Sequence, residues 1–223
     1  MKRIILVFTI LCCCVIANTA FAQDKSKWKP LFGTNLSDAK FNPEVWSETD
    51  GVLAAVKDES IWTINEYENF ELDLEFKTDV ATNSGVVVYC TDRDNWIPNS
   101  VEIQIADDHS ENFKKAKPYE KCGAIYGHLG AKESEVVKKP GEWNRMIVKC
   151  VGQKIYVKLN GKNVTEMDMS KWTSGTKNPD GTDIPSWLPK PFAELPTKGY
   201  IGLQGKHGNS LIWFRNVKIR SIK

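Results

Sequence analysis

The sequence lacks the motifs that mark several common enzyme classes. It has no H-E-x-x-H zinc motif, no G-x-S-x-G nucleophile elbow and no phosphate-binding loop. Its cysteines show no C-x-x-C spacing, so a structural zinc site is not expected. Histidine is scarce, with three in 223 residues. These absences argue against metalloprotease, serine-esterase and phosphate-loop chemistry, and they make each histidine worth locating.

An excess of charge of one sign is also lacking. The full chain has 30 basic and 28 acidic residues. Two of the basic residues, Lys2 and Arg3, belong to an expected leader, so the remaining chain is balanced at 28 of each. No stretch is rich in lysine and arginine, and we therefore expect no nucleic-acid partner.

Long hydrophobic runs are confined to the N-terminus. Residues 1–22 have a basic start, an apolar run over 4–16 and the small-x-small sequence Ala20-Phe21-Ala22, which together are typical of a secretory signal peptide. The apolar run is too short to span a membrane. We expect residues 1–22 to be removed and residues 23–223 to form one exported domain, periplasmic or extracellular, with no transmembrane segment.

Cysteine leaves two questions open. Cys12-Cys13-Cys14 permit a lipid anchor, although the residues before them are not the small pair that lipoprotein signals use. Beyond the leader only Cys90, Cys122 and Cys150 remain, so at most one intrachain disulfide is possible and its pairing is undetermined.

The hydrophobic pattern has the period of β-strands. Residues 70–77 (FELDLEFK) alternate without a break, 101–105 alternate again, and 85–90 are apolar on both faces, as in a central strand. No segment shows a sustained helical period, so we predict an all-β sandwich or jelly roll. Further strands are expected at 145–151, 154–159, from 162, at 200–204 and at 211–222, with turns at Gly152-Gln153 and Asn160-Gly161.

One segment, residues 171–199, does not fit a strand because it contains five prolines. It also contains Trp172, Trp187 and Phe192, which argue against simple disorder. An ordered loop of this length is often functional, so we interpret it as a lid or rim at one end of the sandwich, or else as a structural wrap.

Candidate functional residues occur on the strand over 101–105. Glu102 and Gln104 share one face of it, and Asp107 follows. Retaining glucanases of lectin-like sandwiches need two close carboxylates, commonly as E-x-D-x-x-E. Here Gln104 replaces the middle acid, so that mechanism is not predicted, and a merely solvated strand face remains the alternative.

A second candidate is the turn Gln204-Gly205-Lys206-His207-Gly208, which holds a polar pair between glycines. The alternative is a hairpin turn that happens to contain a histidine. Aromatic platforms for a sugar ring are also available, although most tryptophans are expected to pack in the core. The aromatic candidates are Tyr89, Trp96, Tyr126 and Trp187.

Nine short motifs in one order resemble the bacterial family called the 3-keto-disaccharide hydrolase domain. Each motif is weak alone, but together they are spread over almost all of the range 28–222. They are 28–33 (WKPLFG), 46–53 (WSETDGVL), 67–72 (YENFEL), 83–86 (NSGV), 102–105 (EIQI), 123–127 (GAIYG), 139–144 (KPGEWN), 159–161 (LNG) and 202–217 (GLQGKHGNSLIWFRNV).

The resemblance implies a concanavalin A-like jelly-roll β-sandwich that acts on glycosides already oxidised to a ketone at C3 by a partner dehydrogenase. A C3 ketone acidifies the C2 proton, so a base can remove it and the C1 aglycone can leave by elimination, followed by hydration. This route needs one base and one electrophile, not two close carboxylates. The alternative is a non-catalytic carbohydrate-binding module on the same fold.

Within this interpretation Glu102 and His207 are the acid–base candidates. They are also ligand types for a divalent metal, but two ligands do not make a site, so a metal requirement stays open. The expected substrate-binding residues are Gln104, Gln204, Asn83, Tyr126, Arg215 and Trp187.

Overall fold

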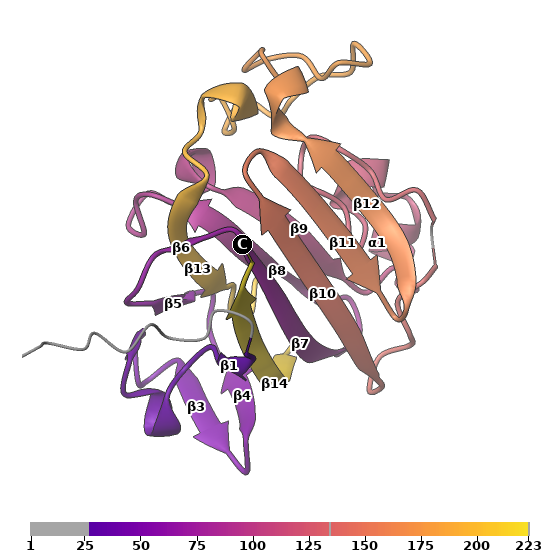
Figure 1. Cartoon of the computed structure of the whole chain (residues 1–223). Coiled ribbons are helices and arrows are strands. Elements are labelled where there is room, and N and C mark those ends of the chain that lie inside the picture. Colours follow the sequence, from indigo (N-terminus) through magenta and orange to yellow (C-terminus); the bar gives the residue numbers. More distant parts are fainter. Residues whose placement is uncertain (1–26, 134, 223) are drawn as a thin grey trace, which may run out of the picture.

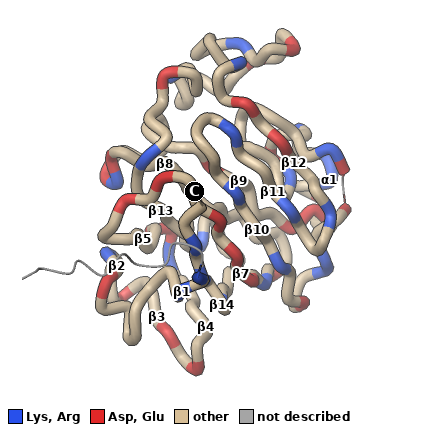
Figure 2. Tube along the Cα trace, in the orientation of Figure 1, with Lys and Arg blue, Asp and Glu red and all other residues tan. Residues whose placement is uncertain are grey.

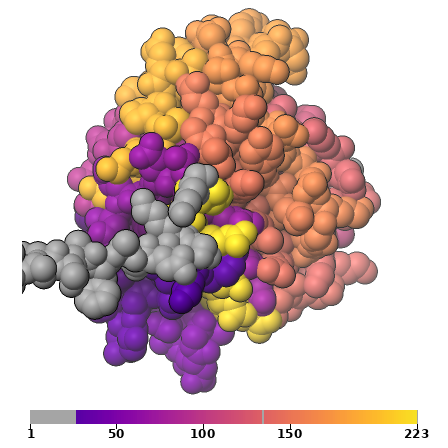
Figure 3. All heavy atoms as spheres, viewed as in Figure 1, coloured from indigo at the N-terminus to yellow at the C-terminus, as the bar shows by residue number. Residues whose placement is uncertain are grey.

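The structure is a computed structural model that describes residues 27–133 and 135–222, and it consists of two antiparallel β-sheets packed face to face (Figure 1). The expected leader, residues 1–22, lies outside the described residues. The first and last parts of the chain meet, because β1 pairs with β14, and Figure 3 shows indigo and yellow atoms side by side there.

The larger sheet has eight strands in the order β12-β11-β10-β7-β14-β4-β3, with β1 added along β14. Its strands are β1 (Lys29–Pro30), β3 (Trp46–Thr49), β4 (Val52–Ala55), β7 (Phe70–Thr78), β10 (Trp143–Val151), β11 (Lys154–Leu159), β12 (Lys162–Asp168) and β14 (Ile212–Ser221). The predicted strands at 70–77, 145–151, 154–159 and 211–222 are therefore confirmed, with bounds that differ by at most two residues.

The smaller sheet has six strands in the order β2-β5-β13-β8-β9, with β6 added along β13. Its strands are β2 (Ala39–Lys40), β5 (Ile61–Thr63), β6 (Tyr67–Glu68), β8 (Asn83–Cys90), β9 (Val101–Ala106) and β13 (Lys198–Leu203). The longer strands β8, β9 and β13 were predicted, whereas β2, β5 and β6 were not, because two or three residues are too few to show a period.

Helical structure is slight, as the sequence predicts. The described residues contain one single-turn α-helix, α1 (Glu111–Lys114), which begins after Ser110. Short 3-10 turns occupy η1 (Thr34–Leu36), η2 (Ile97–Asn99), η3 (Pro118–Glu120), η4 (Met169–Lys171) and η5 (Phe192–Glu194).

The core lies between the sheets and is built by alternation. In β7 the side chains of Phe70, Leu72, Leu74 and Phe76 are fully buried and face the smaller sheet. A β-bulge between Arg215 and Lys218 interrupts the pairing of β14 with β7. Before the bulge the buried side chains of β14 are those of Ile212 and Phe214, and after it Ile219 is buried. The one extra residue of the bulge changes which alternate side chains face the core.

The segment between β12 and β13, at the top of the view in Figure 1, contains residues 171–199 and has both buried and exposed aromatic side chains. Trp172, Ile184, Leu188 and Phe192 are buried and join the hydrophobic core. Trp187, in contrast, is 55% exposed. The segment is therefore anchored by apolar side chains while one tryptophan remains at the surface.

Three further expectations concern cysteines and surface properties. Cys90, Cys122 and Cys150 are buried and are not paired in disulfides. Acidic and basic residues are interspersed along the chain (Figure 2). Among the residues that the structure describes, no helix is long and apolar enough to cross a membrane.

Candidate active site

A cavity of about 770 Å³ opens on the outer face of the smaller sheet, away from the core. It brings together seven of the eight residues that the sequence predicts to act in catalysis or substrate binding. These residues are Asn83, Glu102, Gln104, Tyr126, Trp187, Gln204 and His207. They come from strands, turns and the long loop, so only the folded chain makes them neighbours.

Strand register explains why these side chains share one face. Residues directly opposite one another in an antiparallel sheet point to the same side. One such row crosses the sheet and reads Lys40, Trp62, Gly202, Val87 and Glu102. The centre of the row has small side chains and its flanks have large ones, which leaves a hollow over β8 and β13.

Two more rows extend the hollow toward His207. Gln104 lies opposite Gly85, and the backbone N–H of Gln204 donates to the Gly85 carbonyl at 2.9 Å. One row further, Asn83 forms an isolated bridge with His207. Glu102 and His207 therefore belong to the same face of the same sheet.

Glu102 leans along the sheet because Gly85 has no side chain. A Cβ placed on Gly85 would lie 2.4 Å from Oε1 of Glu102. Glu102 is paired with Val87, yet its carboxyl group lies above Gly85, one row nearer to Asn83 and His207. The carboxyl group thus occupies the middle of the hollow rather than its edge.

The surroundings of Glu102 keep it protonated. Burial, together with the negative charge of Asp58, raises the pKa of Glu102 to about 8. At neutral pH most of the population therefore carries the carboxylic acid, which can donate a proton. Tyr126 also has a raised pKa, because of burial first and the charge of Glu102 second.

His207 has a carboxylate partner that the sequence did not reveal. Nδ1 of His207 lies 2.5 Å from Oδ2 of Asp58. When one ring nitrogen is bound in this way, the other remains available to a ligand. Asp58 lies in a loop without regular pattern, and no spacing in the sequence relates it to a residue 149 positions away.

Amide groups supply the remaining polar contacts of the cavity. Gln104 Nε2 donates to Asn83 Oδ1 at 2.9 Å, which leaves the NH₂ group of Asn83 as the part able to donate to a ligand. Gln204 Oε1 is buried and has no hydrogen-bond partner among the residues described. A buried acceptor of this kind suits a hydroxyl group of a bound molecule.

Aromatic residues form the opposite part of the cavity. The ring of Trp62 lies against Gly202, whose absent Cβ would be 2.5 Å from it. Trp96 meets Trp62 edge-on with 6.2 Å between ring centroids, and the exposed Trp187 lines the rim. Polar groups facing aromatic surfaces suit a sugar, which has hydroxyls at its edge and C–H groups on its faces.

Tyr89 does not belong to the cavity, contrary to the sequence interpretation. Regular alternation along β8 from Asn83, Gly85 and Val87 would place the Tyr89 side chain on the cavity face of the sheet. However, Tyr89 adopts φ of 57° where the pairing of β8 with β13 shifts register. Its ring is buried in the core, and its hydroxyl donates to the Gly152 carbonyl at 2.7 Å.

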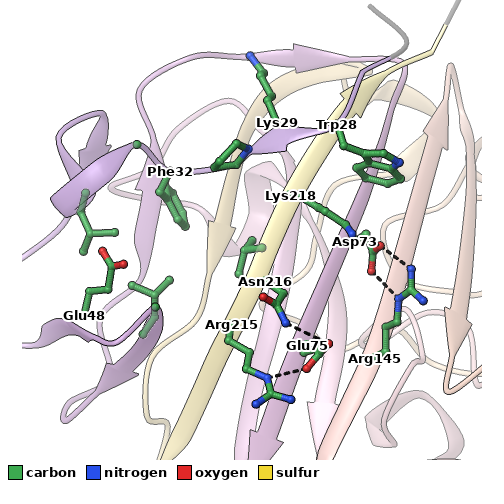
Figure 4. Close-up of a pocket in the computed structure, with 16 residues that line it drawn as sticks. Trp28, Lys29, Phe32, Glu48, Asp73, Glu75, Arg145, Arg215, Asn216 and Lys218 are labelled. Carbon is green, nitrogen blue, oxygen red and sulfur yellow. Dashed lines mark hydrogen bonds and ion pairs between the residues drawn. The ribbon is translucent and has the colours of Figure 1, made fainter.

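Arg215 is also placed elsewhere, so the prediction that it belongs with the other site residues is corrected. It lies on the larger sheet and lines a separate cavity of about 560 Å³ (Figure 4). Its Nε donates to Glu75 at 2.6 Å, and its guanidinium lies 4.0 Å from the centre of the Trp143 ring. Beside it Arg145 pairs with Asp73. Arg215 thus takes part in cross-strand ion pairs of the opposite face.

Metal ligands are sparse in the described residues, where no group of three or more His, Cys, Asp or Glu side chains is arranged to hold an ion. Nδ1 of His207 is already bound to Asp58, so only its other ring nitrogen is free. This donor set does not fit a resident metal, and we derive no chemical step through one.

The arrangement of a glucanase is likewise not formed. Gln104 stands beside Glu102, and the Asp107 carboxylate is turned away from the cavity. Its oxygens accept hydrogen bonds from the backbone N–H groups of Ala81 at 2.8 Å and His109 at 3.1 Å. The cavity therefore offers one protonated acid and one histidine rather than a strand-borne carboxylate pair.

Comparisons with known proteins relate this chain to one family and to several solved structures. A family model described as a 3-keto-alpha-glucoside-1,2-lyase-like domain matches residues 27–220. A structure from Parabacteroides distasonis, provisionally described as a glycosyl hydrolase, is 82% identical, with 88% of this chain and 100% of that chain covered and a TM-score of 0.87. A search among proteins of curated function gave no match.

Two more distant structures bear on the fold alone. A second protein of Parabacteroides distasonis, also provisionally described as a glycosyl hydrolase, is 23% identical, with coverage of 89% and 95% and a TM-score of 0.69. A Bacillus subtilis protein of galectin-like fold is 14% identical, with coverage of 87% and 94% and a TM-score of 0.51. Together with the sheet order, these likenesses confirm the predicted concanavalin A-like jelly-roll β-sandwich.

Proposed function

We propose that this chain, which belongs to the 3-keto-alpha-glucoside-1,2-lyase-like family, cleaves glycosides whose sugar carries a ketone at C3. The observation that carries the proposal is the presence, in one cavity, of a protonated Glu102 and a His207 bound to Asp58. A proton donor and a proton acceptor on one sheet face are what an elimination requires.

The reaction proceeds in two bond-breaking steps. A base takes the C2 proton, and the electron pair of that C–H bond forms an enolate with the C3 oxygen. The enolate then collapses, C1=C2 forms, and the C1–O bond breaks as the aglycone oxygen takes a proton. Water can afterwards add its OH to C1 and its H to C2, which yields the free 3-keto sugar.

Each step has a side chain suited to it. Nε2 of His207 accepts the C2 proton, and the Glu102 carboxylic acid protonates the departing oxygen. The Asn83 NH₂ group donates to the C3 oxygen as it becomes negative. Gln204 Oε1 accepts a hydroxyl of the sugar, with Gln104 steadying Asn83 through their hydrogen bond.

The remaining contacts orient the substrate. Trp62, Trp96 and Tyr126 offer surfaces for the sugar or its aglycone, and Trp187 extends them at the rim. The similar protein described provisionally as a glycosyl hydrolase supports a glycoside-acting role. The substrate must be supplied by a dehydrogenase that oxidises C3, and the signal peptide expected at residues 1–22 would place the reaction outside the cytoplasm.

The direct test is aglycone release by the mature protein from nitrophenyl 3-keto-glucosides of both anomers, with the unoxidised nitrophenyl glucosides as controls. We expect release only from a ketone, slower release when C2 carries deuterium, and loss of release in His207→Ala. Product analysis separates the lyase product from the hydrated one. Binding of unoxidised sugar without any turnover would instead support the binding-module alternative. Treatment with a chelator followed by restored divalent cation would reveal a metal requirement.

The pKa of Glu102 predicts the alkaline limb of the pH profile. An acid must be protonated to act, so activity is lost as the pH rises through the pKa of Glu102, about 8. We expect kcat/KM for a methyl 3-keto-glucoside to fall about tenfold per pH unit above that value. A methyl aglycone is a poor leaving group and depends on the acid. A profile still rising at pH 10 would contradict the assignment.

A further inference from the structure

The backbone holds Asp58 beside His207 through contacts that do not involve either side chain. The Lys206 N–H donates to the Lys57 carbonyl at 2.9 Å. Gly205 lies so close to the same segment that a Cβ on it would be 2.4 Å from the Lys57 carbonyl oxygen. The segment before Asp58 and the segment before His207 are thus locked together.

A second set of contacts fixes the other side of Asp58. The indole N–H of the buried Trp46 donates to the Glu59 carbonyl at 2.8 Å. The Asn42 side-chain amide donates to the Glu59 carboxylate at 3.2 and 3.3 Å. Both chain neighbours of Asp58, Lys57 and Glu59, are therefore held by hydrogen bonds, and the position of Asp58 does not depend on a substrate.

We propose that Asp58 is a positioning residue, whose carboxylate accepts the Nδ1 proton of His207 and so presents the unprotonated Nε2 to the substrate. A histidine without such a partner can carry its proton on either nitrogen. If the proton were on Nε2, the ring would have no lone pair directed into the cavity. The catalytic role of Asp58 rests on the proposed function, whereas the contact between Asp58 and His207 is independent of it.

Asp58 also acts on Glu102. Its negative charge is the second cause, after burial, of the raised pKa of Glu102. The other ionisable groups that line the cavity are Lys40, Glu59, Arg93, Asp94 and Tyr126, and Lys206 neighbours His207 in the chain. One carboxylate would thus serve both partners, by fixing the tautomer of the base and by favouring the protonated acid.

The test uses Asp58→Ala and Asp58→Asn in the full mature chain, with Glu44→Gln as a matched loss of an exposed carboxylate outside the cavity. Ring ¹⁵N shifts of His207 report the tautomer without any substrate. We expect the Nδ1–H form in the native protein and in Glu44→Gln, and a shift toward Nε2–H in Asp58→Ala. An unchanged tautomer in Asp58→Ala would overturn the proposal.

Kinetics give an independent readout. Asp58→Ala should lower kcat about 10- to 100-fold with little change in KM, as expected for loss of an orienting partner. Asp58→Asn keeps a hydrogen-bond acceptor but loses the negative charge that raises the pKa of Glu102. The alkaline limb of the pH–rate profile of this variant should therefore move to lower pH. Thermal unfolding shows whether Asp58→Ala is folded. If it is not, the kinetics and the tautomer of Asp58→Asn test the proposal instead. If the native protein releases no aglycone, the proposed function fails while the tautomer still tests Asp58.

Discussion

Glu102→Gln is expected to lower kcat about 1,000-fold for a methyl 3-keto-glucoside, and far less for the nitrophenyl analogue. The amide cannot transfer a proton to the departing oxygen. A nitrophenolate leaves without that proton, whereas a methoxide does not. The loss with the methyl substrate corresponds to about 4 kcal/mol in the activation free energy. Steady-state kinetics on both substrates at pH 7 measure it.

The difference between the two substrates assigns the role of Glu102. If Glu102 removed the C2 proton, both substrates would slow equally, because that step precedes departure of the aglycone. Arg215→Ala is the matched control, since it removes a charged side chain from the opposite sheet and should leave both rates within about twofold. Equal losses in Glu102→Gln would contradict the assignment as acid, and no loss would place the chemistry elsewhere.

Much of the sandwich could be predicted because the longer strands carry clear local sequence patterns. Uninterrupted alternation identified β7 and β9, and the Asn160-Gly161 turn between β11 and β12 was visible as a dipeptide. In the structure these two residues have φ of 48° and 87°, as a tight hairpin turn requires. The same alternation placed Glu102 and Gln104 on one face, and it was correct about that face.

The rest of the site depends on pairings between distant segments, which no local period reveals. Asp58 meets His207 only because the segments before them pair through the backbone. Trp62 lies in a three-residue strand whose position is set by Gly202 across the sheet. The resemblance to a family identified His207 and Asn83 as candidate site residues. It could not show that Arg215, which follows His207 by only eight residues, lies on the other sheet and points away from them.

Tyr89 shows how one backbone angle can override a correct pattern. Alternation along β8 is regular through Val87, so the sequence favours Tyr89 on the cavity face. A positive φ at Tyr89 and the register shift beside it reverse the next side chains. Cys90 then joins Trp62 and Val87 on the cavity face, while Tyr89 packs in the core. The sequence of this strand contains no residue pattern that predicts such a bulge.

Gly85→Ala is expected to disable the site through Glu102 alone. The new Cβ would lie 2.4 Å from Oε1, 2.9 Å from Cγ and 3.0 Å from Cδ of Glu102, so the acid must move from the centre of the hollow. Gly85 belongs to an extended strand, where alanine is tolerated, and the backbone need not change. We expect kcat for the methyl substrate to fall about 100-fold, because a displaced acid loses its alignment with the departing oxygen.

A double-mutant cycle separates this explanation from general damage to the sheet. If Gly85 matters only by making room for Glu102, Gly85→Ala should cost almost nothing further in a Glu102→Gln background, where no acid remains to be misplaced. Gly202→Ala is the matched control, since its Cβ would press on the Trp62 ring instead. Its effect should persist in both backgrounds. A full 100-fold loss by Gly85→Ala on top of Glu102→Gln would show that the glycine serves the substrate or the strand directly, because the effect could then no longer pass through the acid.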